Sequence, residues 1–231
     1  MPKTLPASPD PGRPYIVIMS AVTLDGKLTV GRGVTSGSLG AFVTYEVVEF
    51  LHDMRASVDA VMVGGNTIVI DNPSLTVRAV DGRSPVRVIV DPEGAVPLES
   101  KVFHDKQAPT IVAVASETAD ERRAALRDMG VKVVVAGDGK FVNVEVLVRA
   151  LAREGIRSLL IEGGATLNWL TIASGLVDEL QIIKLPIVIG DRGSPGFAET
   201  PGDVEAAPAK LECTRTERLG NCMVLYCRRT E

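Results

Sequence analysis

The sequence predicts an α/β protein built on a mostly parallel β-sheet that helices wrap. Short apolar runs of strand length alternate along the chain with segments of helical periodicity, and glycines stand repeatedly where a helix would give way to a strand. Aromatic residues make up only 4% of the chain, whereas Val, Ile, Leu and Ala are plentiful. This composition favours strands that are buried on both faces, as in a parallel sheet covered by helices.

One domain is expected from residue 15 to residue 231. A chain of 231 residues, 45% of them hydrophobic, can bury a single large core. Residues 1–14 contain five prolines. Because proline cannot donate a backbone hydrogen bond, this segment is expected to be a flexible tail. The first strand is the apolar run 15–22, and the turn-prone pair Asp25 and Gly26 follows it.

The next elements repeat the alternation of helix and strand. A helix is predicted from four apolar residues at helical spacing, Val48, Leu51, Met54 and Val58. The apolar run 59–63 then predicts a strand that ends in a pair of glycines. Two further strands are predicted at residues 86–90 and 110–115. Strands separated by helices in this order are typical of a parallel sheet with right-handed crossovers.

Capping signals delimit the two helices that follow. Thr118 and Glu121 have the spacing of a capping box, which predicts a helix that runs to Gly130. A strand is expected over residues 131–135. Asn143 is predicted to cap the next helix and Gly155 to end it. The apolar run 158–161 is then the last strand of the regular alternation.

The C-terminal part of the chain has a different pattern. Residues 179–189 form a long apolar run, and residues 191–208, rich in Gly, Pro and acidic residues, predict a surface loop. Two strand-like runs within 211–229 flank a turn at residues 219–221, which predicts an antiparallel hairpin. This is more sheet than a small monomer readily covers, so a homodimer that uses part of this surface is expected.

Composition excludes several classes of function. The formal net charge is −4 and no basic run is present, which argues against nucleic-acid binding. No segment has the roughly 20 apolar residues of a membrane span or the pattern of a signal peptide, so a cytoplasmic protein is expected. Three cysteines without CxxC spacing and two histidines predict neither a disulfide framework, nor a metal site, nor a histidine-based triad.

A glycine turn is the first candidate for chemistry. Glu162, Gly163, Gly164, Ala165 and Thr166 stand where a predicted strand meets a predicted helix. The backbone amides at a helix N-terminus carry partial positive charge, and glycines let an anion approach closely, so this turn would suit a phosphate. The alternative is a tight turn without a ligand. A position at the carboxyl end of a parallel strand favours the ligand site.

A second glycine turn has the same arrangement. Gly64, Gly65, Asn66 and Thr67 follow another predicted strand, and Asp71 comes shortly after them. Two such turns on one sheet edge could hold the two ends of a dinucleotide. Neither turn fits the G-x-G-x-x-G fingerprint, and no G-x-x-x-x-G-K-[ST] loop occurs in the chain.

Four charged residues are further candidates, each with a structural alternative. Glu162 at the end of an apolar strand should be costly unless it reaches a cleft or finds a hydrogen-bond partner, so it either holds a polar substrate or supports the following helix. Asp25 is either functional or part of a turn. Arg55 and Arg78 either bind a substrate phosphate or are solvated surface groups.

Taken together, these segments resemble the RibD C-terminal reductase family, the dihydrofolate-reductase-like enzymes of riboflavin biosynthesis, and in particular their stand-alone archaeal and fungal type. The resemblance extends from Tyr15 to about Arg228. Six motifs occur in the order of the family, at residues 23–27, 55–64, 67–78, 85–91, 160–167 and 175–179. Motifs in a shared order are much more specific than any single one.

The resemblance implies a three-layer α/β/α fold and a set of site residues. NADPH, with NADH not excluded, would be bound by Thr67, Asp71, Gly163, Gly164, Ala165 and Thr166. The substrate would be faced by Leu75, Arg78, Arg55, Met19 and the catalytic residues Glu162 and Asp25. The family reduces 2,5-diamino-6-ribosylamino-4(3H)-pyrimidinone 5′-phosphate to the ribitylamino compound, with hydride transfer to C1′ of the ring-opened imine. The enzyme would align the two reacting carbons and exclude water.

Two residues depart from the family pattern. Met19 stands where family members often carry a polar residue that faces the substrate, and Ala95 stands where a basic residue would suit the 2′-phosphate of NADPH. A dihydrofolate-type, pterin or specialised-pathway reductase is therefore an alternative, and an NADPH-sensing binding module is the non-enzyme alternative. The zinc motif of deaminase-fused members is absent from the sequence, which indicates a stand-alone reductase without a metal.

Overall fold

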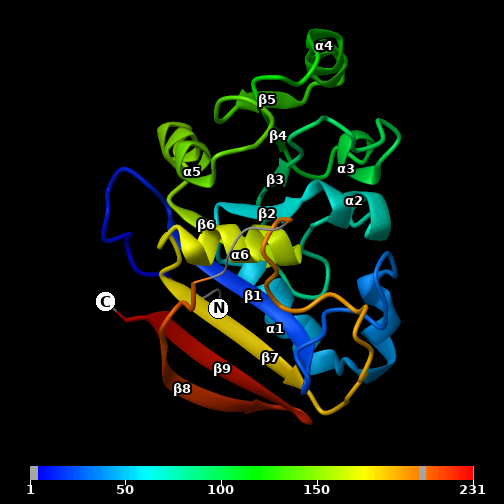
Figure 1. Cartoon of the computed structure of the whole chain (residues 1–231), viewed down its shortest axis with the longest axis vertical. Helices are drawn as coiled ribbons and strands as arrows, with labels where there is room; N and C mark the ends of the chain where they lie inside the picture. The colour runs from blue at the N-terminus through cyan, green and yellow to red at the C-terminus, as the bar shows by residue number, and fades with distance from the viewer. Residues whose placement is uncertain (1–4, 203–206, 231) are drawn as a thin grey trace.

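The computed structural model describes residues 5–202 and 207–230, and it has one large twisted sheet (Figure 1). Parts of the predicted tail and of the predicted loop, residues 1–4 and 203–206, lie outside the described residues. The strands are β1 Tyr15–Thr23, β2 Ala60–Gly64, β3 Val86–Val90, β4 Thr110–Val114, β5 Lys132–Val135, β6 Ser158–Gly163, β7 Glu179–Leu185, β8 Leu211–Leu219 and β9 Cys222–Arg229. The helices are the 3-10 helix η1 Ser36–Phe42 and α1 Tyr45–Ala56, α2 Gly65–Asp71, α3 Lys101–His104, α4 Asp120–Asp128, α5 Val144–Arg153 and α6 Ala165–Ala173.

The strand order is β5-β4-β3-β2-β6-β1-β7-β9-β8. Every pair from β5 to β7 is parallel, and the two pairs that include β9, with β7 and with β8, are antiparallel. This confirms the mostly parallel sheet with a C-terminal hairpin. The order also brings β2, β6 and β1 together, so their carboxyl ends, at Gly64, Gly163 and Thr23, share one edge of the sheet.

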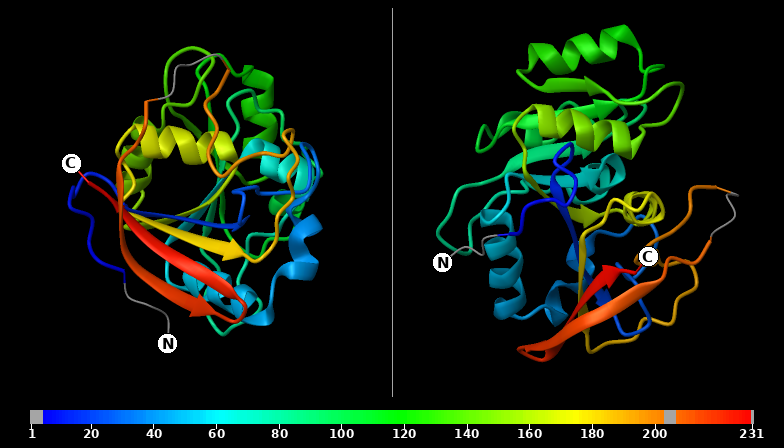
Figure 2. Two further views of the ribbon diagram at one scale, coloured as in Figure 1. Left: turned by 60° about the horizontal axis from the view of Figure 1, so that its bottom comes forward. Right: turned by 90° about the vertical axis from the view of Figure 1, so that its left-hand side faces the viewer.

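Helices cover both faces of the sheet. One buried cluster contains side chains of α1, α2, α3 and α4, and the other contains side chains of α5 and α6. The right-hand view of Figure 2 shows α1 and α6 on opposite sides of the sheet. The central strands are buried on both faces, as β2 and β6 illustrate. The expected three-layer α/β/α arrangement is therefore confirmed.

Helix ends follow the sequence signals with one exception. The Asn143 side chain caps α5 by accepting two backbone amides, and Gly130 and Gly155 adopt the positive φ values of residues that end a helix. The predicted capping box of α4 is wrong, because the hydroxyl of Thr118 donates to the carbonyl of Pro92 at 2.6 Å instead. Thr118 is buried against the loop that follows β3, and α4 begins after Ala119.

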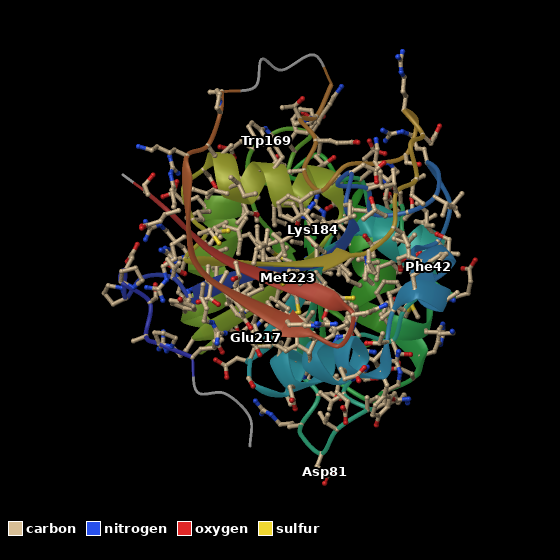
Figure 3. All side chains as sticks on the ribbon, turned by 90° about the horizontal axis from the view of Figure 1, so that it is seen from below. Phe42, Asp81, Trp169, Lys184, Glu217 and Met223 are labelled. Carbon is tan, nitrogen blue, oxygen red and sulfur yellow. The ribbon has the colours of Figure 1, made fainter. Side chains whose placement is uncertain are left out.

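The terminal hairpin forms the outer edge of the sheet. β8 and β9 pair around a two-residue turn at Gly220 and Asn221, and β8 is exposed along most of its length. Seen from below, Glu217 and Met223 mark this hairpin, and Trp169 marks α6 behind it (Figure 3). The preceding strand, β7, ends at Leu185, so the long apolar run to residue 189 leaves the sheet before its end.

Residues 5–14 contain no helix or strand, yet a buried ion pair holds their end. Arg13 donates to both carboxylate oxygens of Asp178 at 2.6 and 2.8 Å, and the same carboxylate accepts the backbone amide of Ile16. No helix within the described ranges is long and apolar enough to cross a membrane.

Candidate active site

The candidate site lies at the carboxyl ends of β2, β6 and β1. Ligands in open α/β sheets bind at this edge, because the loops that follow the strands diverge there. Each of the three strands leads into a segment that the sequence predicted to be functional. β6 leads into the glycine turn, β2 into the second glycine turn, and β1 into the Asp25 turn.

The first glycine turn has a backbone that requires glycine. Gly163 has φ +117°, and Gly164, the N-cap of α6, has φ +41° and ψ 144°. Side chains rarely adopt such values, and no side chain caps the first amides of the helix. The hydroxyl of Thr67 lies 3.7 Å from the position that a Cβ on Gly164 would take. The structure therefore brings Thr67 beside the glycine turn, as the predicted cofactor site requires.

The second glycine turn is packed against the loop after β3. The carboxylate of Asp91 accepts the backbone amides of Ala95 and Val96, each at 2.9 Å, and so shapes this loop. A Cβ on Gly65 would lie 3.3 Å from the same carboxylate. The turn is therefore tight for a structural reason. Asp71, at the end of α2, accepts the backbone amide and the hydroxyl of Ser36 at 3.0 and 2.7 Å.

A buried ion pair connects α1 to the end of β6. Nε and Nη2 of Arg55 donate to the two carboxylate oxygens of Glu162, each at 2.6 Å. The side chains are 7% and 11% exposed. Burial alone would lower the pKa of Arg55, but the charge of Glu162 and these hydrogen bonds more than offset it, so the pKa is raised. Glu162 therefore has the partner that its place on an apolar strand requires.

The remaining guanidinium nitrogen of Arg55 connects the ion pair to the segment after α2. Nη1 of Arg55 donates to the carbonyl of Thr76 at 3.1 Å. Binding a substrate phosphate with this guanidinium would require breaking contacts that are already made. The neighbouring Leu75 is buried and has φ +56°, which is rare for a residue with a side chain and marks a backbone held under constraint.

Arg78 and His52 meet at the other end of this segment. The backbone amide of Arg78 donates to Nδ1 of His52 at 3.1 Å, and the residue itself is exposed. His52 is buried, and its burial, with the positive charges of Arg55 and Arg78, lowers its pKa to about 4 despite the opposing charge of Glu162. Sequence reasoning missed His52, because nothing in a single histidine on a helix shows which backbone amide it will meet.

Met19 lies at the same level of the sheet as Glu162. Ile18 pairs with Ile161, and the next residue of each strand points to the α1 face. Met19 is 2% exposed. The structure therefore places an apolar side chain next to the Arg55–Glu162 ion pair.

Asp25 is held in a turn by several donors. Its carboxylate accepts the hydroxyl of Thr23 at 2.6 Å and the backbone amides of Gly190 and Ile189 at 2.8 and 3.2 Å. These bonds, with the Thr23 hydroxyl the largest contributor, lower the pKa of Asp25 to about 2. Asp25 is therefore a carboxylate at neutral pH and has no proton to donate.

Two buried polar atoms on the α6 side of the sheet lack a partner among the described residues. They are Oγ of Ser20, which lies two positions after Ile18 on β1, and Oδ1 of Asn168 on α6. The amide nitrogen of Asn168 lies 3.9 Å from where a Cβ on Gly163 would be. Sequence reasoning missed both residues, although a polar residue on the apolar face of a helix is a usable signal. Among the residues that the structure describes, no cluster of His, Cys, Asp and Glu could hold a metal ion.

Comparisons with known proteins agree with this architecture. The family model described as RibD C-terminal domain matches residues 14–225. The 2,5-diamino-6-ribosylamino-4(3H)-pyrimidinone 5′-phosphate reductase of Aquifex aeolicus is 43% identical over 183 residues, which cover 79% of this chain and 81% of the relative. The reductase of the same name from Methanothermobacter thermautotrophicus is 37% identical over 217 residues, which cover 92% and 97% of the two chains.

Solved structures show the same fold. The diaminohydroxyphosphoribosylaminopyrimidine deaminase/5-amino-6-(5-phosphoribosylamino)uracil reductase of Thermotoga maritima has a TM-score of 0.74 at 28% identity. The match covers 94% of this chain but 57% of that one. The Saccharomyces cerevisiae riboflavin biosynthesis reductase Rib7 has a TM-score of 0.71 at 24% identity and is covered to 93%.

Proposed function

The chain belongs to the RibD C-terminal domain family, and on that basis we propose that it reduces 2,5-diamino-6-ribosylamino-4(3H)-pyrimidinone 5′-phosphate with NADPH. Relatives that carry this name match most of the chain at 37–43% identity. The observation that carries the proposal is the buried Arg55–Glu162 ion pair beside a glycine turn, on the edge of the sheet where such folds bind ligands.

The residues around α6 fit a dinucleotide phosphate. Gly163 and Gly164 leave the first amides of the helix uncovered, because a Cβ is absent from both and no side chain caps the helix. The hydroxyl of Thr67 borders the same turn. We assign Thr67, Asp71 and residues 163–166 to NADPH, and Asp71 also accepts the amide and hydroxyl of Ser36 at the start of η1. The cofactor would supply the hydride, and the protein would supply its orientation.

Glu162 is proposed to bind the ribosylamino part of the substrate. Arg55 fixes the orientation of this carboxylate through two hydrogen bonds, so Glu162 presents acceptor oxygens at a defined position beside Met19. In this account Arg55 is a positioning residue for Glu162 instead of a phosphate ligand. A preformed acceptor of this kind can align C1′ with the hydride donor without reorganisation during the reaction.

Arg78 is proposed to bind the substrate 5′-phosphate. Its guanidinium has no hydrogen bond or ion pair within residues 5–202 and 207–230. Its backbone is fixed by His52, and Leu75, on the same segment, is proposed to contact the pyrimidine side. Asp25 is proposed to shape the substrate side of the site from the turn after β1. A cytoplasmic homodimer without a metal completes the proposal.

A substrate panel tests this function. Purified protein is mixed with NADPH or NADH and with the diamino-pyrimidinone substrate, its deaminated uracil analogue or dihydrofolate, and the loss of nicotinamide absorbance is recorded. We expect turnover of the diamino compound with NADPH. Because Met19 places an apolar side chain beside Glu162, a dihydrofolate-type or pterin reductase is the second candidate. Turnover of dihydrofolate alone would favour that candidate, and cofactor binding without any turnover would favour an NADPH sensor.

A further inference from the structure

A short segment after β7 joins the cofactor side of the site to the substrate side. We call residues 194–199 the strap. The strap lies between the turn that follows β1 and the first residues of α6, and it is bonded to both. None of the motifs found in the sequence includes it.

On the substrate side, the strap pairs with the Asp25 turn like a short strand. The amide of Leu28 donates to the carbonyl of Pro195 at 2.9 Å, and the amide of Phe197 donates to the carbonyl of Gly26 at 3.0 Å. Lys27 forms an antiparallel bridge with Gly196 between these two bonds. Nζ of Lys27 also donates to the carbonyl of Ser194 at 3.0 Å.

On the cofactor side, the strap is bonded to α6 at two points. The side-chain amide of Asn168, which is fully buried, donates to the carbonyl of Phe197 at 2.8 Å. The amide of Glu199 donates to the carbonyl of Ala165 at 3.1 Å, within the glycine turn assigned to NADPH. The carboxylate of Glu199 accepts the amide of Gly196 at 2.8 Å and so keeps the strap compact.

We propose that the strap, anchored by Asn168, sets the position of the substrate-side turn relative to the bound cofactor. This inference rests on the proposed function. Asn168 is a positioning residue in it: loss of its hydrogen bond would leave each half-site able to bind, while the distance between hydride donor and acceptor would vary. Small displacements of this kind reduce the rate of the chemical step much more than they reduce affinity.

Asn168→Leu, whose side chain branches at the same carbon but cannot donate a hydrogen bond, tests the proposal. We expect kcat to fall at least tenfold, while the dissociation constant of NADPH, measured by fluorescence, changes less than threefold. In the wild type, NADPH should slow hydrogen exchange of the Leu28 amide, because a cofactor that restrains α6 also restrains the strap to which this amide is bonded. Asn168→Leu should abolish this slowing. Thr171→Val is the matched control, because Thr171 is equally buried on α6 but its hydroxyl bonds only to Leu167 within the helix.

A wild-type kcat together with wild-type protection of Leu28 in Asn168→Leu would overturn the proposal. If that variant does not fold, Glu199→Ala takes its place, because it removes the acceptor of the Gly196 amide. Glu199→Gln keeps an acceptor oxygen and should restore kcat. Arg32→Ala removes only the Arg32–Glu199 ion pair and shows whether that pair contributes to the effect. An inactive wild type would contradict the proposed function alone. Hydrogen exchange without cofactor would then test the proposed role of the strap. Asn168→Leu should accelerate exchange of the Leu28 amide, and an unchanged rate would contradict that role.

A separate observation concerns two cysteines in the terminal hairpin. Cys213 on β8 is directly opposite Cys227 on β9. The amide of Thr230 donates to the carbonyl of Lys210, and pairs alternate along an antiparallel ladder, so Cys213 and Cys227 form a non-hydrogen-bonded pair. Side chains approach most closely in such pairs. Cys213 is exposed and Cys227 is half-buried.

We propose that Cys213 and Cys227 are an oxidation site that closes to a cross-strand disulfide. With hydrogen peroxide as the oxidant, the Cys213 thiolate attacks one oxygen, forming a sulfenic acid and releasing hydroxide, which a proton converts to water. The Cys227 sulfur then attacks the Cys213 sulfur, its proton leaves with the sulfenic oxygen as a second water, and the disulfide forms. The peroxide is reduced by two electrons, and the two thiols are oxidised.

Mass spectrometry and thiol counting of the peroxide-treated protein test this site. We expect the loss of two hydrogen atoms, a decrease from three free thiols to one, and a peptide crosslinked between Cys213 and Cys227. Cys222→Ser, which removes the buried cysteine of the same hairpin, should form the same bond, whereas Cys213→Ser and Cys227→Ser should not. Three remaining thiols, or a bond that involves Cys222 or a second molecule, would overturn the proposal.

Discussion

At the scale of single residues, the candidate site depends on an ion pair of which the sequence identifies only one member. An acidic residue at the end of an apolar strand predicts that Glu162 needs a partner or a cleft, and the structure supplies Arg55. The two residues are 107 positions apart, so no local pattern connects them. Asp25, by contrast, bonds to near neighbours and to the loop after β7, and its turn was readable from the sequence.

Glu162→Gln should separate the substrate role of this residue from a structural one. The amide keeps the shape but loses the charge, so we expect the reductase activity to fall by at least tenfold and NADPH affinity by less than threefold. Arg55→Ala, which leaves the Glu162 carboxylate buried without its partner, should lower the free energy of unfolding by about 3–5 kcal/mol. Steady-state kinetics measures the activity of Glu162→Gln, and chemical denaturation measures the unfolding free energy of Arg55→Ala. Equal losses of activity and NADPH binding in Glu162→Gln would assign it to cofactor or structural support.

His52 should make stability depend on pH. Its folded pKa of about 4 is below the ordinary 6.5, so the unfolded chain binds a proton first as the pH falls. The unfolding free energy should therefore decrease from pH 6.5 to about pH 4, by up to about 3 kcal/mol, and be unaffected by His52 above that range.

Comparison with His52→Asn isolates this contribution. Its side-chain oxygen can still accept the amide of Arg78 but does not titrate. Thermal unfolding at several pH values should show a steeper decrease for the wild type than for the variant. Parallel curves for the two proteins would contradict the assignment.

At the scale of elements, most strands and helices were predictable, because buried strands and amphipathic helices have distinct periodicities. The exceptions are informative. The Thr118 capping box matches the sequence rule, but the hydroxyl is satisfied by Pro92, which lies 26 residues away. The strap was not predicted, because its bonds use backbone groups of residues 194–199 that no residue pattern identifies.

Gly163→Ala tests the glycine turn as an element. At φ +117° a Cβ is strained, so the variant should lose about 1–3 kcal/mol of stability and at least tenfold in NADPH affinity. Gly130→Ala is the matched control, because Gly130 also has positive φ but ends α4, away from the site. It should lose stability without losing NADPH affinity. Fluorescence titration with NADPH measures the affinity. Equal affinities for the two variants would contradict the assignment of residues 163–166 to the cofactor site.

At the scale of the whole molecule, the fold class was predictable but the strand order was not. Alternating strands and helices specify a parallel sheet, whereas the insertion of β6 between β2 and β1 depends on contacts between distant segments. That insertion assembles the candidate site, because it brings the glycine turn between Thr67 and the Asp25 turn. The strand order was therefore predictable only through the resemblance to the family, whose motifs occur in the same order along this chain.

The exposed edge strand β8 bears on assembly. An unpaired edge of nine residues is a surface that a second copy can cover, and charged residues along it would limit unspecific pairing. We expect light scattering to give twice the 24.5 kDa mass of the chain. A monomeric mass at micromolar concentration would contradict the proposed homodimer and leave the site unaffected.

The central claim is that hydride passes from the cofactor beside residues 163–166 to C1′ of a ribosylamino pyrimidine held by Glu162. The most direct test is a reaction with NADPH that carries two deuterium atoms at C4 of the nicotinamide, followed by mass spectrometry and NMR of the product. We predict one deuterium at C1′ of a ribitylamino product, and at most a tenth as much labelled product from the Glu162→Gln variant within the same time. A substrate recovered unchanged while NADPH stays intact, or deuterium at any other carbon, would contradict the account.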